Sequence, residues 1–141
     1  MGKVNLSRVI LGGIVAGIIL NVSEWLLHDV VMKDQFRGAL QALGKTPMES
    51  GSVIMWWCIW SFILGITAVW IYAAIRPRYG AGAATAVRAG VAVWVLSCVL
   101  FAIAMTNLGL FPFMPLAIVW SLVGDVIATV AGAWLYKESP V

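Results

Sequence analysis

The chain has 141 residues, of which 62% are hydrophobic and 11% charged, with a mean hydropathy of +0.99 and a formal net charge of +3. A soluble domain carries about 45–50% apolar and about 25% charged residues, so this composition predicts a protein surrounded by lipid. It excludes a secreted disulfide scaffold, a disordered tail and a nucleic-acid-binding module, because the Lys and Arg residues are spread along the chain.

Four apolar segments are long enough to cross a bilayer core of about 30 Å, which takes about 20 helical residues. They are residues 8–31, 52–75, 84–106 and 113–136. A cleavable signal peptide is the alternative for the first, but no small-residue cleavage site follows its apolar core. We therefore predict one all-α membrane domain over residues 1–141, with four transmembrane helices in an antiparallel bundle.

The connection after the first span predicts a short amphipathic helix on the outer membrane surface. Apolar residues recur there at helical spacing, namely Phe36, Ala39, Leu40 and Leu43. Gly44 ends this helix, and residues 46–49 form a capping box with Pro47 that predicts the start of the second span. Pro77 after Arg76 predicts where the second span stops.

Basic residues predict the orientation, since short loops rich in Lys and Arg stay in the cytoplasm. In a four-span arrangement most of them fall on the side of the two termini: Lys3, Arg8, Arg76, Arg78, Arg88 and Lys137, against Lys33, Arg37 and Lys45 on the other side. Both termini are therefore predicted to be cytoplasmic. Aromatic residues at the span ends are predicted interface anchors: Trp25, Trp56, Trp57, Trp70, Trp134, Tyr72 and Tyr136. A cofactor cage is the alternative for Trp56, Trp57 and Trp60.

The second and fourth spans share an aromatic pattern at an offset of 64 residues, from 56 to 120, from 70 to 134 and from 72 to 136. Two tandem helical hairpins related by an axis along the membrane normal would produce it. Belt aromatics at span ends are the alternative explanation.

Small residues form a stripe on two spans, Gly13 and Gly17 on the first and Gly124, Ala128 and Gly132 on the fourth. Transmembrane helices pack through such stripes. We expect these two faces to meet, either within one bundle or across a homo-oligomer.

Asp125 is the ionisable residue at greatest depth, about 18 Å from the outer start of its span. Such a residue is a functional candidate by default because insertion costs about 2.5–3.5 kcal/mol. In one interpretation it pairs with Arg8 or Arg88, or makes a polar contact with Asn21 or Thr129, and locks the bundle. In the other it relays protons or binds a cation.

Glu24 and His28 are four residues apart on one helix face, a spacing that suits a shared metal or a charge-assisted hydrogen bond. Two ligands do not make a metal site, so we predict a structural pair and no metal. Cys58 and Cys98 lack a Cys-x-x-Cys partner and are predicted to be buried small hydrophobic residues. No Gly-rich phosphate loop or catalytic triad is visible, so we predict no cofactor and no enzyme activity.

Residues 70–80 (WIYAAIRPRYG), with the opening 8–13 (RVILGG) and the ending 132–136 (GAWLY), resemble small four-span bacterial membrane proteins of unknown function. The resemblance implies a bacterial cytoplasmic membrane and lends no activity.

These features predict a non-enzymatic integral membrane protein that serves as an accessory, structural or assembly subunit of a larger membrane complex. Its expected partners are the lipid bilayer and other membrane proteins or itself, with no nucleic acid. The alternative is a small homo-oligomeric transporter or channel in which Asp125, Asn21 and Glu24 line a polar path. A third hypothesis is lipid or pigment binding.

Overall fold

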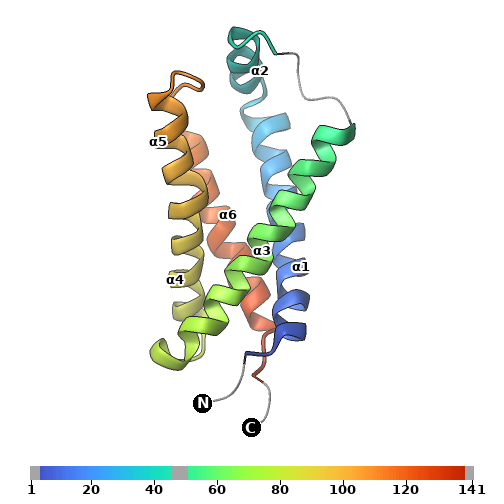
Figure 1. Cartoon of the computed structure of the whole chain (residues 1–141), viewed down its shortest axis with the longest axis vertical. Helices are drawn as coiled ribbons and strands as arrows, with labels where there is room; N and C mark the ends of the chain where they lie inside the picture. Colours follow the sequence, from blue (N-terminus) through green and yellow to red (C-terminus); the bar gives the residue numbers. More distant parts are fainter. Residues whose placement is uncertain (1–3, 46–50, 139–141) are drawn as a thin grey trace.

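The computed structural model of this chain describes residues 4–45 and 51–138. In chain order its helices are α1 (Leu6–Trp25), the π-helical turn η1 (Leu26–Val31), α2 (Lys33–Ala42), α3 (Gly51–Tyr79), α4 (Ala83–Trp94), the π-helical turn η2 (Val95–Val99), α5 (Leu100–Asn107) and α6 (Pro115–Trp134). Within the described residues, 4 continuous rods are long and apolar enough to cross a membrane: Leu6–Val31, Gly51–Tyr79, Ala83–Asn107 and Pro115–Trp134. The predicted all-α bundle with a short extra helix is confirmed (Figure 1).

One helix continues through a proline that is predicted to end it. α3 continues past Arg76 to Tyr79, so the prediction that Pro77 stops the second span is wrong. Proline lacks one N–H donor, and in the last turn of a helix this removes a single bond. Gly80, at φ 85°, ends the helix and still donates its N–H to the Arg76 carbonyl at 2.9 Å. The predicted capping box at residues 46–49 lies outside the described residues.

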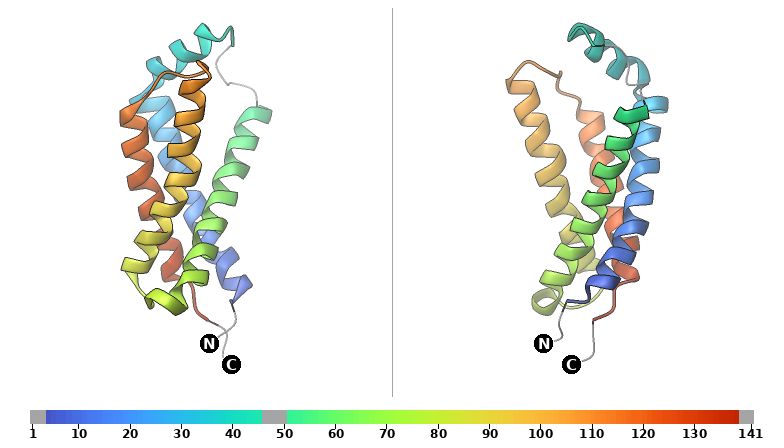
Figure 2. Two further views of the ribbon diagram at one scale, coloured as in Figure 1. Left: turned by 60° about the vertical axis from the view of Figure 1, so that its left-hand side comes forward. Right: turned by 45° about the vertical axis from the view of Figure 1, so that its right-hand side comes forward.

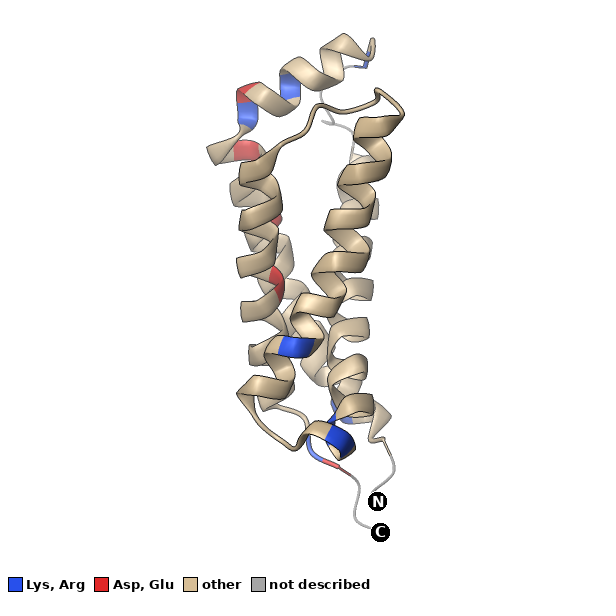
Figure 3. Cartoon of the chain, turned by 90° about the vertical axis from the view of Figure 1, so that its left-hand side faces the viewer, with Lys and Arg blue, Asp and Glu red and all other residues tan. Residues whose placement is uncertain are grey.

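The rods alternate in direction, so both chain ends lie at one end of the bundle, here called the terminal end (Figure 1). The opposite end is called the α2 end because α2 lies over it (Figure 2). Met32 and Ala39 are the buried apolar residues that hold α2 in place. Charged residues gather toward the two ends of the bundle, with few between them (Figure 3).

Close packing in the bundle depends on glycines that bring helix backbones together. α1 packs against α3 and α6, and α4 packs against the same two helices. A Cβ atom on Gly65 of α3 would lie 2.5 Å from the Gly17 nitrogen and 2.6 Å from the Gly13 carbonyl oxygen of α1. The side of α3 that carries Gly65 is therefore in backbone contact with α1.

The expectation that Gly13 and Gly17 meet the small residues of α6 is wrong. Those two glycines face α3, while the next face of α1, about 100° further round, meets α6. There a Cβ on Gly132 would lie 2.6 Å from the Gly12 carbonyl oxygen, and one on Gly124 would lie 2.8 Å from the Ser23 hydroxyl. α1 thus has two adjacent small-residue faces.

The buried positions of the first two rods recur in the last two. Val9, Gly12, Gly13 and Ala16 of α1 correspond, 77 residues later, to Ala86, Ala89, Gly90 and Val93 of α4. Ser61, Gly65, Ala68, Val69 and Tyr72 of α3 correspond, 64 residues later, to Asp125, Thr129, Gly132, Ala133 and Tyr136. The offsets differ by 13 residues because the first hairpin has the longer connection, which contains α2.

Two tyrosines complete this correspondence at the terminal end. The Tyr72 hydroxyl accepts the N–H of Gly82, the N-cap of α4, and the Tyr136 hydroxyl accepts the N–H of Asn5, the N-cap of α1, each at 3.3 Å. Their rings meet edge to face, with centroids 5.9 Å apart. The described residues are therefore arranged as two tandem helical hairpins, with the tyrosines meeting between them.

Candidate functional site

Asp125 lies in the middle of α6 and is only 6% exposed. Its backbone carbonyl accepts a hydrogen bond from the Thr129 hydroxyl at 2.6 Å, and a Cβ on Gly90 of α4 would lie 3.1 Å from the same oxygen. The Asp125 carboxyl group itself makes no hydrogen bond or ion pair with any residue in 4–45 or 51–138. A buried carboxyl group without such a partner is costly and therefore a functional candidate.

The predicted ion pair between Asp125 and an arginine is not formed. Arg88 is exposed and its guanidinium lies over the Tyr79 ring, 5.0 Å from the centroid. Arg8 belongs to the first turn of α1 at the terminal end, where its N–H bonds to the Asn5 side chain. Among the described residues neither guanidinium forms an ion pair with Asp125.

Two groups from other helices approach Asp125. The Glu24 side chain of α1 interacts electrostatically with Asp125, and the Cys98 side chain of η2 interacts with both carboxyl groups. The Ser121 hydroxyl, one turn of α6 from Asp125, lies beside the Cys98 thiol. Three rods thus bring titratable groups close to one another inside the bundle. Cys98 was predicted only as a small hydrophobic residue, and a lone cysteine gives no sequence signal for this position.

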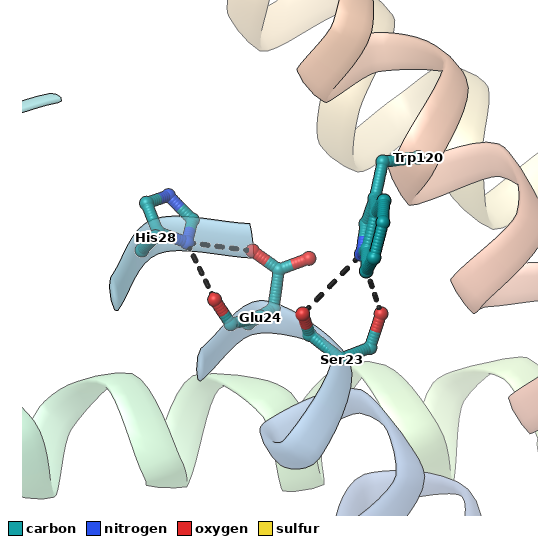
Figure 4. Close-up of polar contacts among 4 residues, drawn as sticks. All are labelled: Ser23, Glu24, His28 and Trp120. Atoms are coloured by element: carbon teal, nitrogen blue, oxygen red, sulfur yellow. Dashed lines mark hydrogen bonds and ion pairs between the residues drawn. The ribbon is translucent and has the colours of Figure 1, made fainter. Parts of the chain in front are cut away.

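Glu24 and His28 lie together at the start of the π-helical turn η1. The His28 Nδ1 atom is 3.4 Å from the Glu24 carboxylate and 2.9 Å from the Glu24 carbonyl oxygen (Figure 4). A carbonyl oxygen only accepts hydrogen bonds, so Nδ1 carries a hydrogen. The imidazole packs against the Phe36 ring of α2, with centroids 4.1 Å apart. Glu24 is therefore connected through His28 to the helix that covers the α2 end.

Trp120 fixes α6 to α1 beside Glu24. Its indole N–H lies 3.0 Å from the Ser23 hydroxyl and 3.3 Å from the Ser23 carbonyl oxygen (Figure 4). Trp94 of α4 makes a similar bond to the Ile118 carbonyl of α6, at 2.9 Å. A partly buried indole N–H needs an acceptor, and both tryptophans find one on a neighbouring helix. The sequence pattern indicated Trp120 only as a repeat of Trp56.

The other predicted site residues take different positions. Asn21 donates its side-chain amide to the Gly17 carbonyl of its own helix at 2.8 Å, so this amide serves α1 itself. Ala128 is buried in the core. The tryptophans predicted as interface anchors are exposed, namely Trp25, Trp56, Trp57, Trp70 and Trp134. Tyr72 and Tyr136 are not lipid-facing anchors, because their rings are buried against each other.

The terminal end holds a second polar cluster. The Arg76 guanidinium lies 3.0 Å from the Glu138 carboxylate and 5.7 Å from the centroid of the Tyr136 ring. Its Nε is buried and has no hydrogen-bond partner among the described residues. A cavity of about 360 Å³ nearby is lined by residues of α3, α4 and α6 together with Tyr136. The cluster ties the end of α3 to the chain that follows α6.

Burial along two rods is confined to the part nearer the terminal end. α4 buries residues as far as Val93, whereas none of the residues of η2 or α5 is buried. In α3 the buried residues begin at Ser61, and none of residues 51–60 is buried. Beyond these buried residues, the ribbons of α3 and α5 diverge toward the α2 end (Figures 1 and 2). We call residues 51–60 and 95–107 the open segments.

The fold and these sites define a class: an all-α helix bundle in which 4 rods of the described chain are long and apolar enough to cross a membrane. Within the same residues, no three His, Cys, Asp or Glu side chains gather closely enough to hold a metal ion. Comparisons with protein-family models, with curated proteins and with solved structures find no match.

Proposed function

We propose that this chain is a non-enzymatic membrane protein that acts by association, as an accessory subunit of a larger membrane complex. A transmembrane helix of a partner protein packs against the open segments of this chain. The terminal end faces the cytoplasm, because the basic residues of the described chain gather there, among them Arg8, Arg76, Arg78 and Arg88.

The absence of burial along η2 and α5 is the observation that carries this proposal. Each rod of a helix bundle buries one stripe along its length. α4 does so through Thr85, Ala86, Ala89, Gly90 and Val93, and the stripe then ends although the rod continues to Asn107. At about 1.5 Å per residue, the 13 residues from 95 to 107 extend for about 20 Å, most of a bilayer core of about 30 Å.

The residue types of the open segments favour a helix as occupant over lipid chains. Ser97, Ala102 and Ala104 are small, and small residues let a second helix backbone approach closely. On α3, Trp56 and Trp60 are exposed. Tryptophan is enriched among the residues that contribute most of the binding free energy at protein interfaces. An apolar partner helix between these two segments would bury both.

Three isoleucines with similar exposed fractions allow a matched cross-linking experiment. Ile54 (54%) and Ile103 (51%) belong to the open segments, whereas Ile127 (54%) lies on the exposed face of α6. A photoreactive benzoylphenylalanine is placed at each in turn, the native membranes are irradiated, and cross-linked peptides are identified by mass spectrometry. We expect Ile54 and Ile103 to attach to a transmembrane helix of the same integral membrane protein, and Ile127 to give lipid adducts.

Three outcomes would contradict the proposal. The first is lipid adducts at all three positions. The second is a yield of protein adducts at Ile127 equal to that at Ile54 and Ile103. The third is cross-links only to a second copy of this chain, which would indicate a homo-oligomer. A bulky substitution provides an independent test after gentle extraction. Ala104→Trp is expected to release the partner, whereas Ile127→Trp is expected to retain it.

A further inference from the structure

Three titratable side chains form a row that rises from the middle of the bundle to its α2 end. At about 1.5 Å per residue, Asp125 lies about 15 Å from the start of α6, while Glu24 and His28 lie about 10 Å and about 5 Å from the end of the first rod. Neighbours in the row interact, Asp125 with Glu24 electrostatically and Glu24 with His28 at 3.4 Å. Glu24 and His28 differ in depth by about one helical turn, and Asp125 lies deeper than both, one residue beyond the contact of Gly124 with Ser23.

Asp125 is the least exposed member of the row. Asp125 is 6% exposed, whereas the side chains of Glu24 and His28 are 38% and 31% exposed. On the terminal side of Asp125 the helices are tightly packed, with Ala128 and Thr129 buried and Gly132 against the Gly12 backbone. The row is thus open at the α2 end and closed at Asp125.

The groups around each member of the row are few. Glu24 and Cys98 are the titratable groups that interact with Asp125. On the other helices packed against α6, Arg88 of α4 lies over the Tyr79 ring, and Arg76 of α3 lies at the terminal end. His28 faces Glu24 on its own rod, Phe36 of α2 and Trp57 of α3, while the charged residues of α2, Lys33, Asp34 and Arg37, are exposed.

We propose that His28, Glu24 and Asp125 form a proton half-path, by which Asp125 exchanges its proton with the aqueous phase at the α2 end and not with that at the terminal end. Chains of Asp, Glu and His at membrane depth perform this task in proton-coupled membrane proteins. The row meets the chemical requirement, because each member releases and accepts a proton and the members follow one another in depth. The half-path does not depend on the partner proposed above.

The test reads the protonation of Asp125 with dicyclohexylcarbodiimide in sided proteoliposomes. This apolar reagent reaches the site through lipid, adds a protonated carboxyl group across its C=N bond and rearranges to an N-acylurea, with no leaving group. Peptide mass spectrometry separates the Asp125 adduct from a Glu24 adduct. The orientation of the protein is established from the reaction of Lys45 with an impermeant amine reagent.

The pH is stepped on one side of the membrane while the other side is buffered. When the pH at the α2 end rises, labelling of Asp125 is expected to fall, by about tenfold per pH unit once most of the residue is ionised. A step at the terminal end is expected to leave labelling unchanged. Labelling that follows the terminal side, that responds equally to both sides, or that is absent at every pH overturns the half-path.

Variants then test the row itself through the rate of proton exchange. Time-resolved infrared spectra after a pH step at the α2 end follow the carboxyl band that Asp125→Asn removes. Glu24→Gln is expected to slow the change in intensity of this band at least about tenfold. Asp29→Asn, at an exposed position on the next turn, is the matched control and should leave the rate unchanged. Equal rates in both variants would exclude Glu24 from the path, and the labelling of the unmodified chain remains decisive if a variant fails to fold.

Discussion

Gly65 of α3 is a position at which a single added methyl group should disturb the bundle strongly. The Cβ of Gly65→Ala would lie 2.5 Å from the Gly17 nitrogen and 2.6 Å from the Gly13 carbonyl oxygen. Carbon normally stays about 3.5–4.0 Å from such atoms, so α1 and α3 must separate by about 1 Å. Both neighbours are backbone atoms, which have no rotamer to change.

The expected cost follows from two opposing effects. Overpacking of a core costs about 1–3 kcal/mol, and backbone contacts belong at the upper end of that range. The better helix propensity of alanine returns about 1 kcal/mol. We therefore expect Gly65→Ala to lower the free energy of unfolding by about 2 kcal/mol, which is a factor of about 30 in the ratio of folded to unfolded protein.

Unfolding of the purified protein in mixtures of dodecyl maltoside and dodecyl sulfate, followed by tryptophan fluorescence, measures this difference. Two other glycines provide a graded control. At Gly90 a Cβ would meet its nearest atom at 3.0 Å, so Gly90→Ala should cost less. At Gly38, inside α2, nothing lies within 4 Å, so Gly38→Ala should raise the free energy of unfolding by up to about 1 kcal/mol through helix propensity alone. The reasoning is refuted if Gly65→Ala is as stable as Gly38→Ala.

Three further predictions use the same unfolding measurement. Trp120→Phe removes the indole bond to Ser23 and should cost about 1 kcal/mol, and Ser23→Ala in that background should add little, because the two changes remove one interaction. Tyr72→Phe and Tyr136→Phe each remove a hydroxyl acceptor at an equivalent place in the two hairpins and should cost about 1 kcal/mol or less; a difference above about 1 kcal/mol between them would contradict the equivalence. Arg76→Met removes both the contact with the Tyr136 ring and the ion pair with Glu138 and should cost about 0.5–1 kcal/mol, and an unchanged stability would show that the two together contribute nothing.

The four spans were predictable because hydropathy over about 20 residues is a strong signal. Gly44 correctly predicts the end of α2, whereas Pro77 does not end α3, because a proline in a last turn removes a single hydrogen bond. Helix contacts were harder to predict. A glycine pair such as Gly13 and Gly17 predicts a packing face but does not predict which helix packs there. The pair meets Gly65 of α3, and a single glycine gives no such pattern in the sequence.

At the candidate site, the depth of Asp125 and the adjacency of Glu24 and His28 were accessible because they depend on spacing within one helix. The approach of Asp125 to Glu24, and of Cys98 to both, depends on how α1, η2 and α6 pack, which no spacing along the chain encodes. The two arginines were assigned to Asp125 on charge alone. Arg8 lies in the first turn of α1, and Arg88, although two residues from the Gly90 that packs against the Asp125 backbone, places its guanidinium over the Tyr79 ring.

The two hairpins bury equivalent positions, yet they differ in chemistry at one of them. Where the first hairpin has Ser61, the second has Asp125, and only the first hairpin carries the extra helix α2. A single hairpin that paired with an identical copy would have to place every acidic residue twice and balance both charges in the same interior. Joining the two hairpins in one chain removes that constraint, so one half can keep a serine at this position while the other carries a costly carboxyl group.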